Sequence, residues 1–372
     1  MKVLVTGGGT GGHINPAIAI ANTIKAHEPD SEIAFVGTSR GMENKLVPQA
    51  GYPLMHVEVR GLRRSLSLEN IKVLFMTLKA LHDAKKIVKQ FRPDLVVGTG
   101  GYVCYPICRA AASMGVPVAL HESNAVPGVA VKMLASCADR IYLNFESTAQ
   151  YLNQKDKLLR VGNPLKNEYS VLSKEEARKR LGISEDCLYL VSCGGSLGAA
   201  RINAEILTLM KEYSAKHPNL IHVHATGAAG YEEFMTAFRE QGLERHPNLQ
   251  PVEYLYDMPL RLSAADLVIN RAGAMTLSEL AMLGKAAILI PSPNVTDNHQ
   301  YKNAKAVADA DAALLLQESD LLPGTLVGAV SSLLEDPARR AVFSANFRAF
   351  AVENASERIY SDLKRLVISR NL

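Results

Sequence analysis

The 372-residue sequence has no tryptophan, and only 6% of its residues are aromatic. Because single-stranded nucleic acids are commonly bound by stacking their bases on aromatic side chains, we expect no nucleic-acid partner. No stretch approaches the roughly 20 uninterrupted apolar residues of a membrane-spanning helix. A strand pattern begins directly at the first residues, without the apolar core or cleavage site of a signal peptide, so we predict a protein that is not exported.

Cysteines are few, and none has the spacing of a zinc site or a CxxC motif. They stand at Cys104, Cys108, Cys137, Cys187 and Cys193. An odd number without a disulfide framework predicts reduced thiols in the cytoplasm. The one Asp-x-Asp sequence, Asp309–Asp311, is expected to end a helix rather than to follow a glycine-rich turn. We therefore predict neither a metal site nor a cofactor.

Length and charge both indicate two parts. A chain of 372 residues is too long for one ordinary core, which favours two domains. The residues through Asn163 include 19 Lys and Arg against 12 Asp and Glu, whereas the remainder has 22 against 25. A basic first half is suited to a phosphorylated substrate or to an anionic membrane surface.

The stretch that follows Val3–Thr6 has the strongest functional signal. After this β-branched run, five of the six residues Gly7–Gly12 are glycine, and a helix pattern begins. Glycine lets the backbone approach a ligand closely, and the first turn of a helix presents N–H groups that lack intrahelical acceptors. The pattern predicts a pocket for a phosphate or another anion, with His13 at the entrance of the helix.

Two other kinds of nucleotide site also begin with a glycine-rich turn after a strand. No Lys-Ser or Lys-Thr pair follows the glycines, which excludes a P-loop. Gly7, Gly9 and Gly12 fit the dinucleotide pattern G-x-G-x-x-G, but the second strand has no acidic residue at its end. Arg40 stands there and is able to contact a 2′-phosphate, so an NADP-dependent oxidoreductase remains an alternative.

The first half alternates short apolar runs with helix patterns, as in a doubly wound parallel sheet. The expected strands are Lys2–Thr6, Ile33–Gly37, Met55–Val59, Leu95–Gly98, Val118–Leu120 and Arg140–Leu143. A second glycine turn, Gly98–Tyr102, and the segment His121–Asn124 each follow a strand. Ligands bind beyond the carboxyl ends of such strands, so we expect both segments to lie beside the first turn.

A basic helix is expected from about Leu68 onward. One helical face has the apolar residues Ile71, Leu74, Phe75, Leu78 and Leu81, with lysines around it. Either this face packs on the sheet, or it rests as an apolar patch rimmed by cations on an anionic bilayer. The sequence leaves both interpretations open.

The expected domain boundary is Val161–Pro164. After it, the second half repeats the order of strand, glycine-rich turn and helix seen at the start of the chain. Ser173–Glu176 predicts a capping box for a helix that ends at Gly182. Strand Cys187–Cys193, turn Gly194–Gly198 and the helix that follows repeat the opening pattern. Two such halves predict two Rossmann-like domains that face each other across a cleft.

A third glycine turn follows the predicted strand Leu267–Asn270. Thr276 is expected to cap the next helix or to donate to a phosphate, and Glu279 to accept the two hydroxyls of a ribose. The alternative for Glu279 is the acid of a capping box, worth about 1 kcal/mol. Thr296–Tyr301 is predicted to be a polar loop that binds sugar hydroxyls.

Taken together, these stretches resemble the MurG family of glycosyltransferases. The matching motifs are Gly8–His13, Gly98–Tyr102, His121–Asn124, Val161–Pro164, Gly194–Ala199 and Arg271–Glu279. The resemblance implies a GT-B fold. It also implies a cytoplasmic, peripheral membrane enzyme that moves N-acetylglucosamine from UDP-N-acetylglucosamine, with inversion, to the 4-hydroxyl of the muramoyl residue of the undecaprenyl-pyrophosphoryl acceptor, lipid I.

The resemblance also implies roles for individual residues. His13 is the first candidate for the general base, and Glu122 and Asn124 are the second. The groups expected to contact the two substrates are Thr10, Gly11, Gly12, Asn124, Lys166, Ser196, Leu255, Ala274, Met275, Thr276, Glu279 and Gln300. Many relatives have Gln where Ser123 stands, and some have Arg where Lys166 stands. Lysine keeps the charge of arginine but loses its bidentate geometry.

The implied division is an acceptor-binding, membrane-associating domain over 1–163, a donor-binding domain over 164–340 and a helical segment over 341–372 that packs back across the domain junction. Other interpretations remain open. They are another GT-B enzyme (a UDP-N-acetylglucosamine 2-epimerase or a glycolipid glycosyltransferase), the NADP-dependent oxidoreductase, and a nucleotide-binding scaffold without activity.

Overall fold

A computed structural model describes residues 1–59, 69–165, 172–195 and 198–370. The chain forms two units: Met1–Leu165 together with Val352–Leu372, and Lys166–Ala351. The first crossing between the units therefore comes two residues after the expected boundary at Asn163. The expected terminal segment 341–372 is divided between the units, because its first part packs on the second unit and only residues from Val352 onward join the first.

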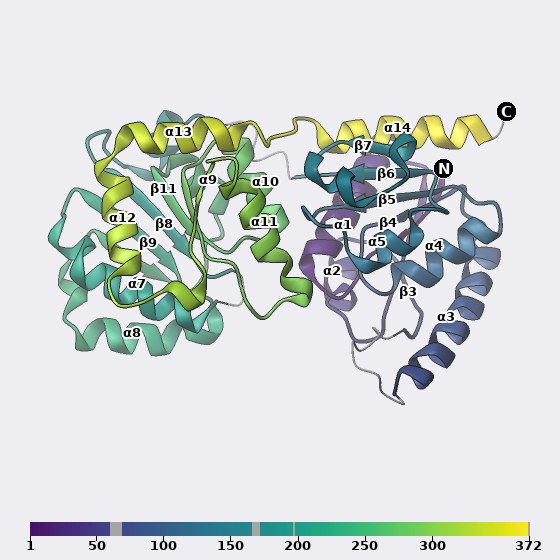
Figure 1. The fold of residues 1–372 in the computed structure, drawn as a ribbon, viewed down its shortest axis with the longest axis horizontal. Helices are drawn as coiled ribbons and strands as arrows, with labels where there is room; N and C mark the ends of the chain where they lie inside the picture. Colours follow the sequence, from purple (N-terminus) through teal and green to yellow (C-terminus); the bar gives the residue numbers. More distant parts are fainter. Residues whose placement is uncertain (60–68, 166–171, 196–197, 371–372) are drawn as a thin grey trace. The chain divides into compact units, whose positions relative to one another are not determined.

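The described part of the first unit contains a seven-stranded parallel sheet in the order β3-β2-β1-β4-β5-β6-β7 (Figure 1). The strands are β1 Lys2–Thr6, β2 Glu32–Gly37, β3 Leu54–His56, β4 Leu95–Gly98, β5 Val118–Glu122, β6 Arg140–Leu143 and β7 Leu158–Arg160. The central strands are apolar over nearly their whole length because helices cover both faces. The predicted doubly wound sheet is confirmed.

Helices on the two faces of this sheet bury separate apolar clusters. The helices are α1 Gly11–His27, α2 Glu43–Gln49, α3 Glu69–Phe91, α4 Cys104–Ser113, α5 Val129–Leu134 and α14 Ala355–Arg370. One cluster includes residues of α3, α4 and α5, and the other includes residues of α1 and α14. Helix α14 is held by Asp362, whose carboxylate accepts hydrogen bonds from Arg140 Nε at 2.8 Å and from the Tyr142 hydroxyl at 2.9 Å. The last helix is thus part of the core of the first unit.

Two predicted elements of the first unit differ from the structure. Strand β3 ends at His56 rather than at Val59. Helix α3 buries Ala80, Ala84 and Val88, whereas Leu78 of the predicted apolar face is 56% exposed. The side chains of Ile71, Leu74 and Phe75 lie outside the described residues. Small side chains of α3 are buried because this helix packs beside α4, whereas the larger Leu78 lies on the exposed side.

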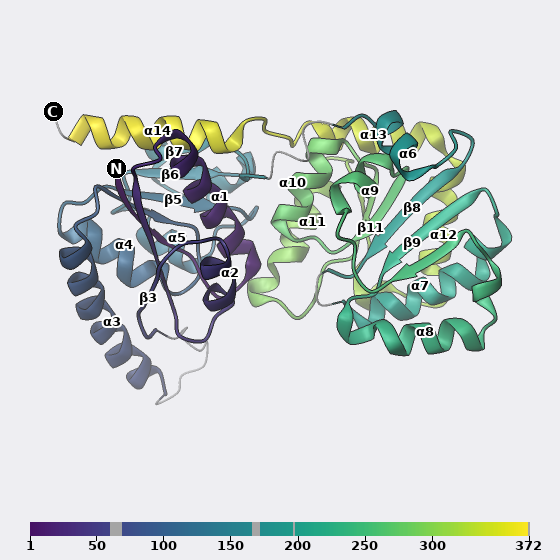
Figure 2. The same ribbon diagram turned by 180° about the vertical axis from the view of Figure 1, so that it is seen from behind.

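The described part of the second unit contains a six-stranded parallel sheet in the order β10-β9-β8-β11-β12-β13 (Figure 2). The strands are β8 Leu188–Cys193, β9 Leu220–Ala225, β10 Leu249–Val252, β11 Leu267–Asn270, β12 Ala287–Leu289 and β13 Leu314–Leu315. The helices are α6 Lys174–Leu181, α7 Ala200–Glu212, α8 Tyr231–Glu240, α9 Met258–Ala264, α10 Ala274–Leu283, α11 His299–Ala308, α12 Thr325–Glu335 and α13 Pro337–Arg348. Strand order and parallel pairing match the first unit, which confirms the repeated Rossmann-like pattern.

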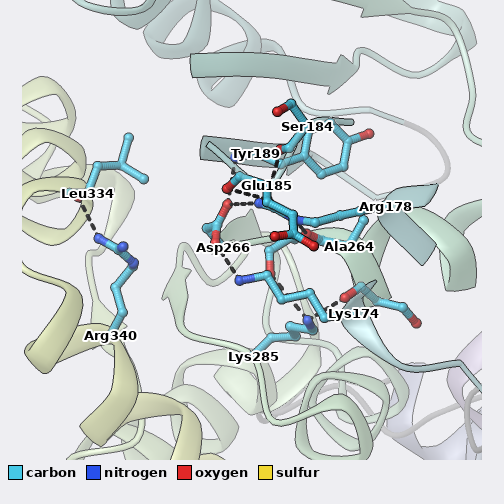
Figure 3. A network of polar contacts seen from close by, with 12 residues as sticks. Lys174, Arg178, Ser184, Glu185, Tyr189, Ala264, Asp266, Lys285, Leu334 and Arg340 are labelled. Carbon is cyan, nitrogen blue, oxygen red and sulfur yellow. Dashed lines mark hydrogen bonds and ion pairs between the residues drawn. The ribbon is translucent and has the colours of Figure 1, made fainter. Parts of the chain in front are cut away.

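The predicted Ser173 cap of α6 and its predicted end at Gly182 are confirmed. The Ser173 hydroxyl accepts the Glu176 N–H at 3.1 Å, and Gly182 ends the helix with a φ of 67°. Beside α6, a network of charged groups joins the amino ends of β8, β11 and β12 (Figure 3). The Asp266 carboxylate accepts Lys174 Nζ at 2.6 Å, the Arg178 guanidinium and the Tyr189 N–H at 2.7 Å. Ion pairs and hydrogen bonds to main-chain carbonyls, among them those donated by Arg178 and Lys285, together fix this edge of the sheet.

Candidate active site

The first glycine-rich turn leads directly into α1. Thr10 is the N-cap in an extended conformation, and its side chain makes no capping hydrogen bond. Gly9 has a φ of +86°, which a residue with a side chain rarely adopts. Gly11 and Gly12 are the first two helical residues, where amide groups lack intrahelical acceptors. The predicted contact residues Thr10, Gly11 and Gly12 therefore lie together at a helix N-terminus suited to an anion.

His13 connects the two glycine turns of the first unit. Its Nδ1 donates to the Thr99 carbonyl at 3.1 Å, and the Thr99 hydroxyl donates to the His13 carbonyl at 2.7 Å. The Gly8 N–H donates to the Gly100 carbonyl at 3.3 Å, and a Cβ on Gly100 would lie only 2.4 Å from His13 Nδ1. Because a carbonyl only accepts, the neutral ring has its hydrogen on Nδ1, which makes Nε2 the basic nitrogen.

Glu122 is committed to hydrogen bonds with neighbouring main-chain and side-chain groups. The prediction places it in a loop, but it is the last residue of β5, because the strand pairs with β6 as far as Leu143. Its Oε1 accepts the N–H and the side-chain amide of Asn124 at 2.9 and 3.0 Å, and its Oε2 accepts the Gly128 N–H at 2.8 Å. Burial raises the pKa of the Glu122 carboxyl, and these hydrogen bonds oppose the rise.

His121 is fully buried one residue earlier on β5. Its Nε2 donates to the Gly162 carbonyl at 3.0 Å, and the Ser123 hydroxyl lies 3.4 Å from its Nδ1. Burial lowers the pKa of His121 to about 4, so the ring is neutral at physiological pH. The geometry fits a residue that orients the segment Glu122–Asn124.

In the second unit, the turn after β11 leads into α10 as predicted, but the cap is a different residue. Gly273 is the N-cap, and Ala274, Met275 and Thr276 are the first three helical residues. The expectation that Thr276 caps the helix is therefore wrong. The capping-box alternative for Glu279 is also wrong, because Glu279 lies six residues after the cap instead of three. Glu279 is half-buried on the second turn of α10.

The other predicted donor contacts lie on separate segments of the second unit. Leu255 is buried between Tyr254 and Tyr256, which is 92% exposed. Gln300 is the second residue of α11, and its Oε1 accepts the Ser292 N–H at 2.9 Å. The predicted polar loop Thr296–Tyr301 is thus a short 3-10 helix and the start of α11, made possible by the left-handed conformation of Asn298. Ser196 and Lys166 lie outside the described residues.

Several polar residues around these turns have roles that no sequence motif indicates. In the second unit, the Arg271 guanidinium pairs with Glu318 at 2.5 Å and donates to the Ile290 carbonyl at 3.1 Å. Buried His224 lies 3.1 Å from Asn203 Oδ1, and the Asn203 amide donates to the Thr226 carbonyl at 3.0 Å. The Arg271 contacts join the segments that follow β11, β12 and β13, and the Asn203 contacts join α7 to the end of β9. Only the topology of the sheet brings these residues together.

Within the described residues, no group of three or more His, Cys, Asp or Glu side chains is arranged to hold a metal ion. The structure also has no helix, over its described ranges, that is long and apolar enough to cross a membrane.

Comparison with known proteins assigns both units. Residues 3–143 match the family model for the glycosyltransferase family 28 N-terminal domain, and residues 189–359 match that for the family 28 C-terminal domain. With two Rossmann-like units and glycine turns at the carboxyl ends of their strands, the protein is a glycosyltransferase of the GT-B class.

Similar proteins narrow this class. The UDP-N-acetylglucosamine–N-acetylmuramyl-(pentapeptide) pyrophosphoryl-undecaprenol N-acetylglucosamine transferase of Acetivibrio thermocellus is 41% identical over 99% of this chain and 98% of that protein. The enzyme of the same name from Desulfitobacterium hafniense is 44% identical over 91% of each. The chain therefore belongs to the MurG family, which confirms the resemblance and removes the oxidoreductase alternative.

Comparison with solved structures supports the same family. The crystal structure of Acinetobacter baumannii MurG is 28% identical, covers 98% of this chain and 99% of that one, and has a TM-score of 0.80. A UDP-N-acetylglucosamine 2-epimerase from Neisseria meningitidis is 16% identical over 98% of this chain and 100% of that one, with a TM-score of 0.65. The epimerase shares the fold alone.

Proposed function

We propose that the protein transfers N-acetylglucosamine from UDP-N-acetylglucosamine to the 4-hydroxyl of the muramoyl residue of lipid I, with inversion at the anomeric carbon. The near full-length relatives named for this transfer support the proposal. The observation that carries it is the His13 ring, which lies at a helix N-terminus with Nδ1 bonded to Thr99. A general base has to be oriented and have a basic atom available, and this geometry meets the first requirement directly.

In the first unit, we assign Thr10, Gly11 and Gly12 to the acceptor diphosphate and the donor sugar. Nε2 of His13 is assigned to proton removal from the attacking hydroxyl. Glu122 and Asn124 were the second candidates for the base. Since both oxygens of Glu122 already accept hydrogen bonds, its proposed role is to position Asn124 for contact with a substrate.

In the second unit, the amides at Ala274, Met275 and Thr276, together with Ser196, are proposed to meet the UDP diphosphate. Donors at a helix N-terminus stabilise the charge that develops on the leaving group. Glu279 is assigned to the ribose, the Leu255 backbone to uracil and Gln300 to the transferred sugar. Lys166 is proposed to contact one of the two substrates. The proposed division of labour is acceptor binding by residues 1–163 and donor binding by residues 164–340.

We further propose that the protein lies on the cytoplasmic face of the membrane without crossing it. Leu78 is exposed on α3, and the exposed cations Lys79, Lys85 and Lys86 follow it on the same helix. An apolar side chain beside several cations suits an anionic bilayer, where each cation contributes about 1 kcal/mol. An acceptor linked to a lipid is presented at that surface.

The decisive experiment incubates the pure protein with labelled UDP-N-acetylglucosamine and a lipid I analogue. We expect a labelled disaccharide on the lipid and release of UDP. If calorimetry shows that the donor binds but no labelled product forms, the proposed transfer is wrong.

A further inference from the structure

A carboxylate that no motif singled out lies beneath the first glycine-rich turn. Glu43 is the first residue of α2, and its side chain is fully buried. Its Oε2 accepts the Gly9 N–H at 3.0 Å, and its Oε1 accepts the N–H and the hydroxyl of Thr38, each at 2.9 Å. One carboxylate therefore joins the turn after β1 to the segment after β2.

Glycines make the space for this carboxylate. A Cβ on Gly8, Gly37 or Gly41 would lie 2.8, 2.5 or 1.9 Å from an atom of the Glu43 side chain. Contacts this short do not occur between packed groups, so each of the three positions requires glycine for as long as Glu43 stays in place. Because Gly8 belongs to the turn, the conformation of the turn depends on the position of the Glu43 carboxylate.

The charge of Glu43 is directed at neutral donors. Burial by itself would raise the pKa of this carboxyl, but the hydrogen bonds from Gly9 and Thr38 outweigh it and hold the pKa below its ordinary value. The group is thus ionised at neutral pH. A negative charge behind the turn repels a diphosphate, so any contribution of Glu43 to acceptor binding has to come from geometry.

We propose that Glu43 is a positioning residue for the acceptor half of the reaction. By holding the Gly9 amide, it fixes the path of the chain into α1, and with it the directions of the Gly11 and Gly12 amides and of His13. The inference rests on the proposed function, in which these groups contact the acceptor. A displacement of about 1 Å in such a group can lower a rate about 100-fold.

Glu43→Gln is the direct test, because glutamine keeps the shape but replaces one acceptor oxygen with an NH2 donor. Gly9 and Thr38 can then no longer both be satisfied. We expect kcat/KM for the lipid-linked acceptor to fall about tenfold or more, with the calorimetric Kd for UDP-N-acetylglucosamine within about twofold of the unaltered enzyme. Asp362→Asn is the matched control, since it alters another hydrogen-bonded carboxylate of the same unit, one that holds α14. This control is expected to lower the melting temperature without a selective loss of kcat/KM for the acceptor.

Hydrogen exchange of the peptide covering residues 8–13 gives a readout that does not need turnover. We expect faster exchange in Glu43→Gln than in the unaltered protein or in Asp362→Asn. Unchanged exchange would overturn the proposal, and so would equal losses toward donor and acceptor. If the unaltered enzyme forms no product, the transfer itself is wrong, and the exchange result still decides whether Glu43 holds the turn.

Discussion

The carboxyl-end edge of the first sheet and the amino-end edge of the second use polar side chains in different ways. At the first edge, His13, Glu43 and Glu122 bond mainly to main-chain N–H and C=O groups of loops. At the second, hydrogen bonds to main-chain carbonyls also occur, but they are joined by ion pairs of Asp266 with Lys174 and Arg178 beside the ends of strands. Bonds to the main chain fix where a loop runs, whereas paired charges fix one element against another. The first edge is thus built for precise placement and the second for stability.

His13→Ala is the strongest test of this contrast. Loss of a general base is expected to lower kcat by about 10²- to 10⁴-fold. The melting temperature and the Kd for UDP-N-acetylglucosamine should change little, because Nδ1 bonds to a loop carbonyl and the nucleotide of the donor is assigned to the other unit. His27→Ala, on the exposed end of the same helix, is the control and should keep normal turnover. Near-normal turnover in His13→Ala would remove it as the base.

Asp266→Asn should show the opposite behaviour. Removing this buried charge leaves Arg178 without its anion and is expected to lower the free energy of unfolding by about 3 kcal/mol. Because the network lies at the amino ends of the strands, kcat per folded molecule should not change. Denaturant unfolding and turnover measured on the same samples provide the check. Asp309→Asn, which breaks an exposed pair with Lys305, should cost less than about 0.5 kcal/mol. Comparable losses in both variants would contradict the assignment.

The sequence allowed much of the fold to be predicted, because buried parallel strands and glycine turns have strong local patterns. Strands β1, β4, β6 and β11 begin and end where expected. The prediction placed the N-cap of α10 at Thr276 because threonine often caps helices. The observed N-cap, Gly273, has no side chain that could form a capping hydrogen bond. Glu43 could not be found, since its role depends on Gly9, 34 residues away in the sequence, and no spacing encodes that contact.

Glu279→Ala tests the proposal that the second unit binds the donor. Loss of charge-assisted hydrogen bonds to a ribose is expected to weaken binding of UDP-N-acetylglucosamine about 10- to 100-fold. Acceptor KM at saturating donor should remain within about twofold, because the acceptor is assigned to the first unit. Glu212→Ala, at the exposed end of α7, is the control for removing a glutamate from a helix of the same unit. An equal effect on both substrates would argue against a ribose contact.

The smallest expected effect concerns Lys285, a buried lysine beside the Asp266 ion pairs whose pKa is lowered to about 8. Burial is the main cause and the positive charge of Lys174 adds to it, while Lys285 Nζ donates to the Ser263 and Ala265 carbonyls at 2.6 and 3.2 Å. Since the unfolded chain keeps this proton up to a higher pH, folding is penalised below pH 8, and the penalty fades as the pH rises toward 10.5. The free energy of unfolding should therefore gain roughly 1 kcal/mol from Lys285 between pH 7 and pH 9.

Lys285→Met removes this gain and also leaves the two carbonyls without their donor, so the variant should be less stable at both pH values. The informative quantity is the difference in the pH dependence of unfolding between the variant and the unaltered protein, with the exposed Lys305→Met as control. A Lys285 variant with the same slope as the unaltered protein would mean that the amine is solvated and titrates normally. The stability of the amino-end edge would then depend on Asp266 and Arg178, with no contribution from the titration of Lys285.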